Sequence, residues 1–431
     1  MPVMEPLAGK SNLGHPPIFR YRTLLKHALL QRYNHCHRGR VKQRNVQQPR
    51  YPAVSCECTT PSNMTFTVLT ESDVRQITRN LSAAQLDGFV HSLEQALIDY
   101  SCNDGAKHQP ERAVVTKPGG QVSLFMPATT EHLNGVKTVG IRPPDAPTGG
   151  TPTPGLKSVL TLCDATGQAI GVLNAAELTA FRTSLGAMLL FKYRTAVANI
   201  VVFGAGKQAF WHIRLAMLMR GSDISKITIV NRSRARTEAL IIEIRESSGD
   251  ACSHINIAAL ENGDDRQAML KELIVQADAI FCTTPSTQPL FPSEWLASKD
   301  SQKPCYLSAI GSYRLDMQEI DPDLLQHVAN PASASSYPSY KGGTIAVDSI
   351  EGCLKEAGEL VKAAIPVQKM MELGKILQAK SQSGDDELVQ WLERGFLVYK
   401  SVGIGVMDLA TGHHLLSQAG SHSIGLHLDS L

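Results

Sequence analysis

The chain has 431 residues, of which 43% are hydrophobic, and its formal net charge is +2 at pH 7. That length is enough for two or three domains with sizeable cores. The near-neutral charge gives no reason to expect nucleic acid or a membrane surface as the main partner, and no run approaches the roughly 20 apolar residues of a membrane-spanning helix. The nine cysteines are scattered without a CxxC pair, which is typical of reduced, mostly buried thiols in an intracellular protein, and we expect no metal site.

Residues 1–63 differ in composition from the rest of the chain. Up to Pro52 they contain many lysines and arginines but a single acid, Glu5. Basic, acid-poor N-termini are typical of organelle transit peptides. Two other interpretations stay open, a disordered tail and an upstream extension of a functional chain that starts at Met64. We therefore expect a cytoplasmic protein, or a mitochondrial one if this segment is a transit peptide.

The region from 64 to about 191 mixes strand and helix patterns. The predicted strands cover 66–69, 112–116, 121–126, 135–141, 156–164 and 169–173, and the predicted helices cover 73–80, 82–99 and 176–191. Ser82 and Gln85 have the spacing of a capping box at the start of the second helix. The Pro- and Gly-rich stretch 142–155 is expected to be a long loop, and long loops inside compact domains are often functional.

The segment 198–209, ANIVVFGAGKQA, carries a dinucleotide-binding pattern. Its short run of β-branched residues predicts a buried strand, and the apolar-rich helix that follows is expected to end with Gly221 as its C′ residue. Between them, Gly204 permits a tight turn, Gly206 lets a pyrophosphate approach the backbone, and Ala209 lets the helix pack closely. The free N–H groups at the start of the helix would face the phosphates.

The next predicted strand, 226–230, ends in Asn231, Arg232 and Ser233. An Asp or Glu near this position binds the ribose 2′-hydroxyl of NAD, whereas a cationic, hydrogen-bonding cluster suits a 2′-phosphate. The sequence therefore predicts NADP(H), with NAD(H) as the alternative. The arginines here would also fit a solvated helix start.

Strands and helices alternate regularly from 195 to about 348, which predicts a doubly wound parallel sheet. The further strands are expected at 254–258, 279–283, 305–310 and 344–347. Two strand ends, 282–286 and 308–312, are rich in hydroxyl groups and are expected to lie beside the cofactor, although Ser, Thr, Pro and Gly also form simple turns. Beyond them we predict helices over 353–364 and 385–395, a strand over 398–405, and a final helix from 407 to about 418.

Eight stretches share the residues and the order of one known family. They are FMPAT (125–129), GVKTV (135–139), ELTAFRTSLGAML (177–189), VVFGAGKQA (201–209), ADAIFCTTPS (277–286), LSAIGS (307–312), EAGEL (356–360) and KSVGIGVMDLA (400–410). Together they resemble the ornithine cyclodeaminase/μ-crystallin family from about Met64 to the C-terminus. The resemblance implies an α/β fold in a homodimer, with a Rossmann-type dinucleotide domain at 192–400 and a mixed α/β substrate-binding and dimerisation domain at 64–191 plus 401–431.

Members of that family reduce cyclic ketimines, interconvert amino and keto acids, or convert ornithine to proline with loss of ammonia. The resemblance implies that Arg112 and Arg182 clamp the substrate carboxylate, which the fork of a guanidinium suits. Lys137 would sit near the substrate nitrogen and act as acid, or as base if desolvation lowers its pKa. Asp408 matches a family acid near the nicotinamide, but it would also fit a charge favoured at a helix N-terminus. Arg112 would also fit an exposed surface position.

One residue departs from the cyclodeaminase pattern. Ornithine cyclodeaminases of the family carry an Asp after the fourth strand, and that position is Ser286 here. A serine cannot act as a carboxylate base, so the sequence favours an NAD(P)H-dependent reductase of α-imino acids or an amino-acid dehydrogenase. The two alternatives are an ornithine cyclodeaminase, which would be an ammonia-lyase, and a non-catalytic NADPH-binding protein. The residues expected to bind the cofactor are Gly204, Ala205, Gly206, Gln208, Ala209, Asn231, Arg232, Ser233, Thr284, Ser286, Ile310 and Gly403.

Overall fold

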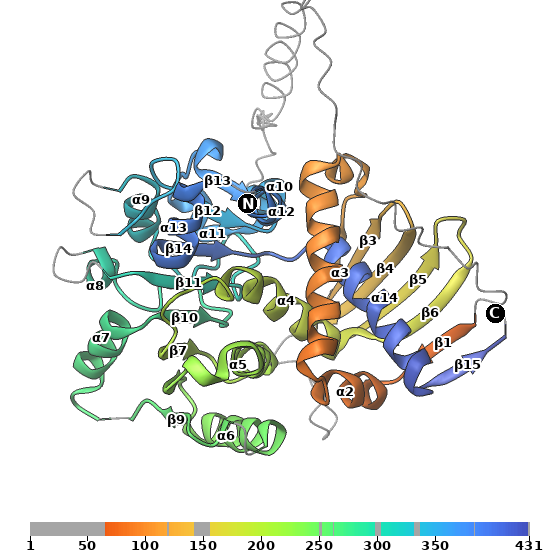
Figure 1. Ribbon diagram of the computed structural model, residues 1–431, viewed down its shortest axis with the longest axis horizontal. Coiled ribbons are helices and arrows are strands. Elements are labelled where there is room, and N and C mark those ends of the chain that lie inside the picture. The colour runs from red at the N-terminus through yellow and green to blue at the C-terminus, as the bar shows by residue number, and fades with distance from the viewer. Residues whose placement is uncertain are drawn as a thin grey trace, which may run out of the picture. The chain divides into compact units, whose positions relative to one another are not determined.

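The described part of the chain is built around two β-sheets, one of seven strands and one of eight (Figure 1). This computed structural model describes residues 65–118, 120–141, 156–249, 252–261, 263–297, 303–331, 337–382 and 384–429. The predictions for the N-terminal segment 1–63, for a start at Met64 and for the loop 142–155 lie outside the described residues.

The seven-stranded sheet has the order β15-β1-β6-β5-β4-β3-β2. Its strands are β1 (Phe66–Leu69), β2 (Ala113–Thr116), β3 (Val122–Thr129), β4 (Leu133–Ile141), β5 (Leu156–Asp164), β6 (Ala169–Asn174) and β15 (Leu426–Leu428). Only β1 and β6 pair in parallel among these strands, and the other pairs are antiparallel. Successive side chains alternate between the two faces, as the period of two requires: in β4, Lys137 and Val139 are buried whereas Val136 is exposed.

Helices pack on one face of this sheet. They are α2 (Glu71–Arg79), α3 (Ala83–Cys102), α4 (Ala175–Phe191) and α14 (Gly405–His422), and α3 and α14 lie side by side in Figure 1. Helix α14 presses closely on β4, because a Cβ at Gly135 would lie 2.6 Å from Leu409 Cδ2. On the other face, large apolar side chains are exposed, including Val115, Phe125, Val136 and Leu426.

The eight-stranded sheet is parallel throughout and has the order β13-β12-β14-β11-β10-β7-β8-β9. Its strands are β7 (Asn199–Phe203), β8 (Lys226–Val230), β9 (Asn256–Ala259), β10 (Ala279–Cys282), β11 (Cys305–Ala309), β12 (Ile345–Val347), β13 (Met370–Glu372) and β14 (Phe396–Lys400). The strands nearest its centre are buried on both faces, as is usual for parallel sheets. The predicted doubly wound α/β fold is confirmed.

Nine helices of the described part accompany these strands. They are α5 (Lys207–Arg220), α6 (Arg234–Ser248), α7 (Arg266–Gln276), α8 (Glu294–Ala297), α9 (Pro322–Ala329), α10 (Ile350–Glu356), α11 (Gly358–Lys362), α12 (Leu373–Ser381) and α13 (Asp386–Arg394). Strands β13 and β15 were not predicted, because three residues are too few to show a period. Helix α12 was also not predicted.

Three local predictions were wrong. The single helix expected over 353–364 is two helices, because Gly358 packs so tightly that a Cβ there would lie 2.1 Å from Met317 O. The strand expected over 398–405 ends at Lys400, and α14 already begins at Gly405, because Gly403 has φ +84° and breaks the extended backbone. Gly221 is not a left-handed C′ residue, since its φ is −55° and it begins a 3-10 turn.

Helix starts follow the sequence more closely. The Ser82–Gln85 capping box is confirmed. Helix α2 begins at Glu71 rather than at 73, because Thr70 forms a second capping box with Asp73 that was not predicted. Strand β2 begins at Ala113, which leaves Arg112 just before it. In the described part six cysteines are unpaired, and three of them, Cys282, Cys305 and Cys353, are buried. No described helix has the length and apolar character needed to span a bilayer.

Candidate functional site

The turn after β7 forms a bare backbone cradle. Gly204 has φ +108°, and a Cβ there would lie 2.6 Å from Thr283 Oγ1, so both the conformation and the space require glycine. Gly206 is the N-cap of α5, carries no capping side chain, and has open space where a Cβ would be. Ala209 is fully buried beneath the turn. Exposed N–H groups at a helix start beside a glycine suit the pyrophosphate of a dinucleotide, so these residues fit that group.

The carboxyl ends of β7, β10 and β11 lie side by side next to this turn. The Thr283 hydroxyl donates to Phe203 O at 2.6 Å. A Cβ at Gly311 would lie 2.1 Å from Thr284 O, so the two neighbouring loops touch backbone to backbone. The Thr284 hydroxyl donates to Glu319 Oε1 at 3.0 Å, and the Ser286 hydroxyl donates to Gln288 O at 2.6 Å. Both predicted cofactor hydroxyls are therefore engaged within the protein, while the nearby Ile310 is buried.

The predicted ribose end lies after β8. The Asn231 side chain donates to Ser233 O at 3.0 Å, and Ser233 caps α6 by accepting from the Arg236 N–H at 3.4 Å. Arg232 is exposed. Arg234, by contrast, forms an ion pair with Glu238 at 2.7 Å. Asn231 and Ser233 thus shape the start of α6, and Arg232 is left at the surface beside it.

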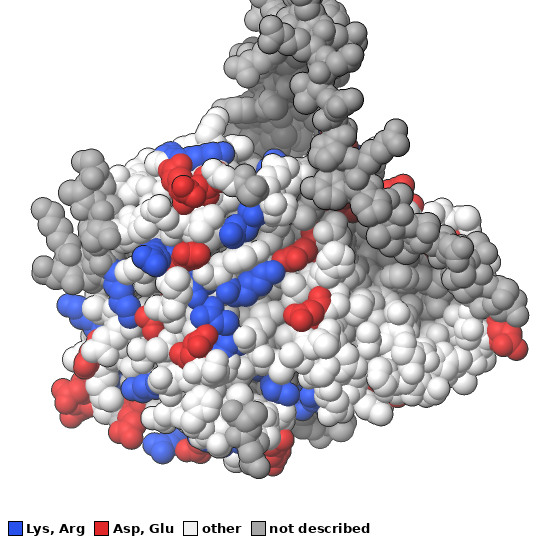
Figure 2. All heavy atoms as spheres, viewed as in Figure 1, with Lys and Arg blue, Asp and Glu red and all other residues white. Residues whose placement is uncertain are grey.

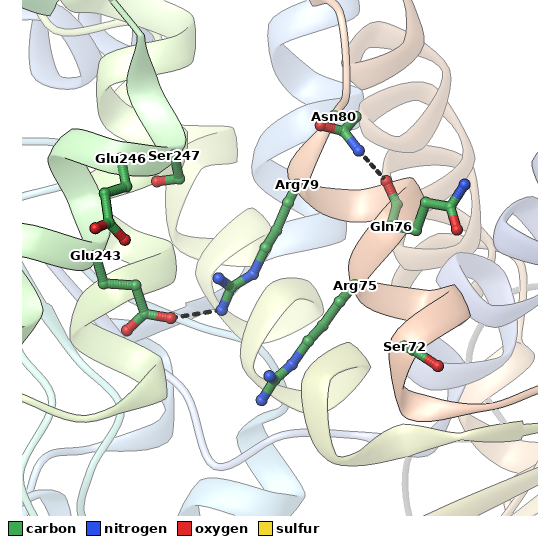
Figure 3. A pocket seen from close by; sticks show the side chains of 8 residues that line it. All are labelled: Ser72, Arg75, Gln76, Arg79, Asn80, Glu243, Glu246 and Ser247. Carbon is green, nitrogen blue, oxygen red and sulfur yellow. Dashed lines mark hydrogen bonds and ion pairs between the residues drawn. The ribbon is translucent and has the colours of Figure 1, made fainter.

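Two adjoining cavities lie between α2 and α6, and they have volumes of about 500 and 460 Å³. In the first, Arg79 reaches across to Glu243 at 2.6 Å (Figure 3). The second extends to Gly206 and Lys207, and Arg236 also lines it. The remaining predicted turn residues lie nearby: Ala205 lines the second cavity, and the Gln208 side chain accepts from Ser184 at 3.5 Å. The cationic groups of these cavities face acids as well, so their lining has mixed charge.

Three predicted catalytic residues form a buried ion cluster at the start of α14. Lys137 Nζ lies 2.6 Å from Asp408 Oδ2, and Arg182 Nε lies 2.9 Å from Asp408 Oδ1. Lys137 comes from β4, Arg182 from α4 and Asp408 from the first turn of α14. Their exposed fractions are only 1%, 3% and 0%. Two cations facing one carboxylate leave the cluster with a surplus positive charge, which suits an anionic group.

The pKa values in this cluster follow from burial and from the charges. Burial lowers the pKa of Lys137 to about 8, although the attraction of Asp408 opposes this and the repulsion of Arg182 adds to it. Burial alone would raise the pKa of Asp408, but Arg182 and Lys137 together outweigh it and hold that pKa below its ordinary value. Asp408 is therefore a fixed anion, while Lys137 can hold or release a proton near neutral pH.

Arg112 lies at the edge of the same region. Its Nη1 donates to Glu356 Oε2 at 2.8 Å, and its Nη2 donates to Gly403 O at 2.7 Å. A Cβ at Gly403 would lie 2.9 Å from the guanidinium nitrogens of Arg182, so the Gly403 backbone lies between the two arginines. Arg112 and Glu356 also line a cavity of about 470 Å³ that includes Met126 and Pro127. All four predicted catalytic residues thus lie around the segment 401–408.

Three buried or half-buried acids that contact predicted site residues or the loops beside them were not predicted. Glu356 lies in the EAGEL stretch and pairs with Arg112; burial raises its pKa. Asp348 accepts the Gly403 N–H at 2.6 Å and the Ser401 hydroxyl at 2.7 Å. Asp348 directly follows β12, so the rule that sites lie at the carboxyl ends of strands could have found it. Glu319 lies in an irregular segment that has no local pattern.

Comparison with known proteins places this geometry in context. A family model described as the ornithine cyclodeaminase/mu-crystallin family matches residues 69–421. An uncharacterized cyclodeaminase of Dictyostelium discoideum is 27% identical over 308 residues, which are 68% of this chain and 78% of that protein. A delta(1)-pyrroline-2-carboxylate reductase of Bacillus cereus is 26% identical over 318 residues, which are 70% of this chain and 83% of that protein.

Solved structures share the fold. Thermococcus litoralis delta(1)-pyrroline-2-carboxylate reductase in complex with NADH and L-proline has a TM-score of 0.64 at 20% identity, covering 84% of this chain and 99% of that one. An archaeal alanine dehydrogenase dimer with bound NAD has a TM-score of 0.63 at 19% identity, covering 85% of this chain and 99% of that one. At these identities the similarity shows the fold alone, and it agrees with the two-sheet α/β architecture described above.

Proposed function

The chain belongs to the ornithine cyclodeaminase/mu-crystallin family, and from this premise we propose that it is an NAD(P)H-dependent oxidoreductase acting on the C–N bond of an α-imino or α-amino acid. The observation that carries the proposal is the buried cluster of Lys137, Arg182 and Asp408 with its surplus positive charge. A buried surplus charge is costly unless a ligand of opposite sign offsets it. An α-carboxylate is such a ligand, and a relative named as a reductase of a cyclic imino carboxylate supports the choice.

In this proposal each of the two sheets carries a different binding site. The dinucleotide binds across the carboxyl edge of the parallel sheet, in the part from 192 to 400, at the Gly204 turn. The substrate binds to the part formed by 64–191 and 401–431, where the catalytic candidates gather around α14. The tight turn at Gly204 and the uncapped helix start at Gly206 support the first assignment. The cluster at Asp408 supports the second.

The mechanism assigns each side chain a separate task. When bound, the reduced nicotinamide supplies a hydride for the imine carbon. Arg112 and Arg182 bind the carboxylate and orient the substrate, and their forked guanidinium groups suit two oxygens. Lys137 holds a proton at Nζ and donates it to the substrate nitrogen, because its lowered pKa lies near the working pH. Asp408 positions both Lys137 and Arg182 and stays ionised throughout.

We assign NADP(H) as the preferred cofactor on the residues after β8. Asn231, Arg232 and Ser233 replace the acid that would bind a ribose 2′-hydroxyl, and the exposed Arg232 can pair with a 2′-phosphate. Arg236, which lines the cavity beside Gly206, adds a second cation near this edge. NAD(H) is the alternative, because the solved structures with this fold are complexes with NADH and NAD.

We also propose that the protein is a homodimer that pairs through the open face of the seven-stranded sheet. Val115, Phe125, Val136 and Leu426 on that face are 47%, 40%, 37% and 57% exposed, and an apolar sheet face of this kind is typical of an interface. The alanine dehydrogenase with this fold is a dimer. Figure 2 shows charged side chains of both signs intermixed over the part that carries the eight-stranded sheet, so no surface of a single charge marks an alternative interface in that view.

A second candidate function is ornithine cyclodeaminase, because one relative is named as a cyclodeaminase. The hydroxyl of Ser286 is bound to Gln288 O rather than directed to a ligand, and a serine cannot supply the carboxylate that this reaction is expected to need. The reductase therefore stays the first choice.

The test combines cofactor titration with turnover. NADPH and NADH are titrated by fluorescence, and their oxidation is then followed with a panel of cyclic imino acids and with keto acids plus ammonia. We expect tighter NADPH binding and turnover on a cyclic imino acid. Ammonia release from ornithine without net cofactor oxidation would favour the cyclodeaminase, and cofactor binding without any turnover would favour a binding protein.

A further inference from the structure

We propose that Glu319 is a positioning residue that fixes the loops after β10 and β11 in the geometry that the dinucleotide needs. The inference rests on the proposed dinucleotide binding. It concerns a buried carboxylate that lies outside the catalytic cluster and outside the family motifs noted in the sequence. The loops are 283–286, after β10, and 310–312, after β11.

The carboxylate of Glu319 joins the two loops directly. Its Oε1 accepts the Thr284 N–H at 2.6 Å and the Thr284 hydroxyl at 3.0 Å. Its Oε2 accepts the Gly311 N–H at 2.6 Å. Each oxygen thus serves a different loop, and one planar group sets the distance between them. Hydrogen bonds to an ionised acceptor are short and strong, so this bridge is stiff.

The bridge extends to the glycine turn through close contacts. A Cβ at Gly311 would lie 2.1 Å from Thr284 O, and a Cβ at Gly204 would lie 2.6 Å from Thr283 Oγ1. The Thr283 N–H also donates to Phe203 O at 3.0 Å. The ends of three adjacent strands are therefore packed in one row, and a movement of the middle loop would shift the glycine turn. Glu319 binds the middle loop, 283–286, on the side of that loop that faces away from Gly204.

Glu319 itself has little freedom to move. Its side chain is fully buried. Its carbonyl accepts the Leu290 N–H at 2.9 Å, and the preceding Gln318 donates its N–H to Ser286 O at 2.8 Å. The backbone on both sides of the loop is thereby tied to the segment that carries Glu319. A side chain held in this way transmits its position to Thr284 rather than adapting to it.

Ser312, which follows Gly311 in the loop after β11, is held by a different set of hydrogen bonds. Lys400 Nζ donates to Ser312 O at 2.6 Å, and the Ser312 hydroxyl donates to Glu359 at 2.5 Å. Lys400 and Glu359 are fully buried as well. These groups fix the far end of the loop 310–312, whereas the carboxylate that joins this loop to Thr284 is that of Glu319.

The charge of Glu319 is sensitive to pH. Burial raises its pKa to about 7, against the opposing attraction of Lys400 and the N–H groups of Thr284 and Gly311, while Glu359 raises it further. The buried thiol of Cys282 on β10 also faces this carboxylate. The carboxylate is therefore ionised above pH 7 and becomes neutral below it, where it is a poorer acceptor for the two loop amides.

The experiment compares Glu319→Gln with Glu372→Gln in the full chain. An amide has one acceptor oxygen, so the substituted side chain can serve only one loop and would turn its NH₂ toward the N–H of the other. Glu372 is a matched control, because it is 8% exposed and accepts the Ile350 N–H at 3.1 Å, at the distant end of the sheet. Thr284→Val, which removes one of the three donors, is the second variant if Glu319→Gln does not fold.

The measurements are the Kd for NADPH and NADH, by fluorescence, and hydrogen exchange of the Thr284 and Gly311 amides without cofactor. We expect Glu319→Gln to raise the Kd about tenfold, which corresponds to about 1.4 kcal/mol, and to speed exchange at both amides, with a smaller change for Thr284→Val. Glu372→Gln should change neither. The difference in Kd between wild type and Glu319→Gln should shrink as pH falls through about 7.

Unchanged affinity and unchanged exchange in Glu319→Gln, or equal losses in the Glu372→Gln control, would overturn the inference. If Glu319→Gln does not fold, an unchanged Kd in Thr284→Val would overturn it. Failure of the proposed reaction can be distinguished from failure of this inference. In that case wild type would bind the cofactor without turnover, and the comparison of Kd values would still decide the role of Glu319. A wild-type protein that binds neither NADPH nor NADH would overturn both the proposed function and the proposed role of Glu319.

Discussion

At the scale of single residues, the proposed chemistry depends on charges that are held out of water. Lys137, Arg182 and Asp408 are almost fully buried, and each ionised group there is tolerable only because the others offset it. The surplus positive charge is what an α-carboxylate would neutralise. Loss of one cation should therefore weaken substrate binding far more than binding of the dinucleotide, whose proposed site is the turn at Gly204.

Arg182→Ala tests this division. We expect kcat/KM on a cyclic imino acid to fall by about 100-fold or more, because a charged ligand loses its buried partner, while the Kd for NADPH stays near that of wild type. Steady-state kinetics and fluorescence titration measure the two quantities. Arg245→Ala, which removes an exposed arginine from α6, is the control and should change neither. Wild-type rates in Arg182→Ala would refute the carboxylate clamp.

The lowered pKa of Lys137 leads to a pH prediction with a definite sign. A lysine is protonated below its pKa, so kcat/KM for imine reduction should be constant at lower pH and should fall as pH rises through about 8. In the reverse direction the neutral amine is needed as a base, so the rate of amino-acid oxidation should rise through the same pH. A pH–rate profile in both directions measures this. An inflection that survives in Lys137→Met would assign it to another group.

At the scale of elements, the junction between β14 and α14 joins the two sheets at the site. The strand ends at Lys400, the segment 401–403 is tied to Asp348, and α14 then delivers Asp408 within its first turn. Gly403 makes the junction possible, because its φ of +84° is one that other residues adopt only at a cost. The position of Asp408 thus depends on a short irregular segment rather than on either element alone.

Gly403→Ala should show that dependence. We expect a loss of unfolding free energy on the order of 1–2 kcal/mol from the left-handed backbone, and a raised KM because the new Cβ would meet the Arg182 guanidinium at 2.9 Å. Chemical denaturation and kinetics measure the two effects. Gly420→Ala, within α14, has open space for its Cβ, so it should be neutral or stabilising by about 1 kcal/mol. Equal behaviour of the two variants would contradict the proposed strain.

At the scale of the whole molecule, the open face of the seven-stranded sheet predicts an assembly. Phe125→Asp combined with Val136→Asp should shift the protein toward monomer, because two charges would be buried at the proposed interface without partners. Sedimentation velocity at several concentrations measures the change. Ile242→Asp replaces a side chain that is 57% exposed on α6 and should leave the assembly unchanged. If the wild type is a monomer, or if the double variant is still a dimer, the open sheet face is not the dimer interface.

The sequence alone determined the local architecture of the parallel sheet. The run of β-branched residues before Gly204, the two glycines and the small Ala209 encode a strand, a bare turn and a closely packed helix, because each effect acts within a few residues. The Ser82 capping box was predictable for the same reason. Short strands such as β13, the helix break at Gly358 and the early start of α14 were not, since packing against distant backbone decides them.

Only the tertiary structure decided how the site is assembled. Lys137, Arg182 and Asp408 lie in three separate stretches, and a family resemblance named them without showing that one carboxylate bridges both cations. Glu319 had no local signal, because a carboxylate in an irregular segment is indistinguishable by sequence from an ordinary surface acid. The pairing of Arg112 with Glu356 was not predictable either, because the two residues lie 244 positions apart in the chain. Periodicity and turn chemistry are properties of neighbours in sequence, whereas burial and the pKa values it sets are properties of neighbours in space.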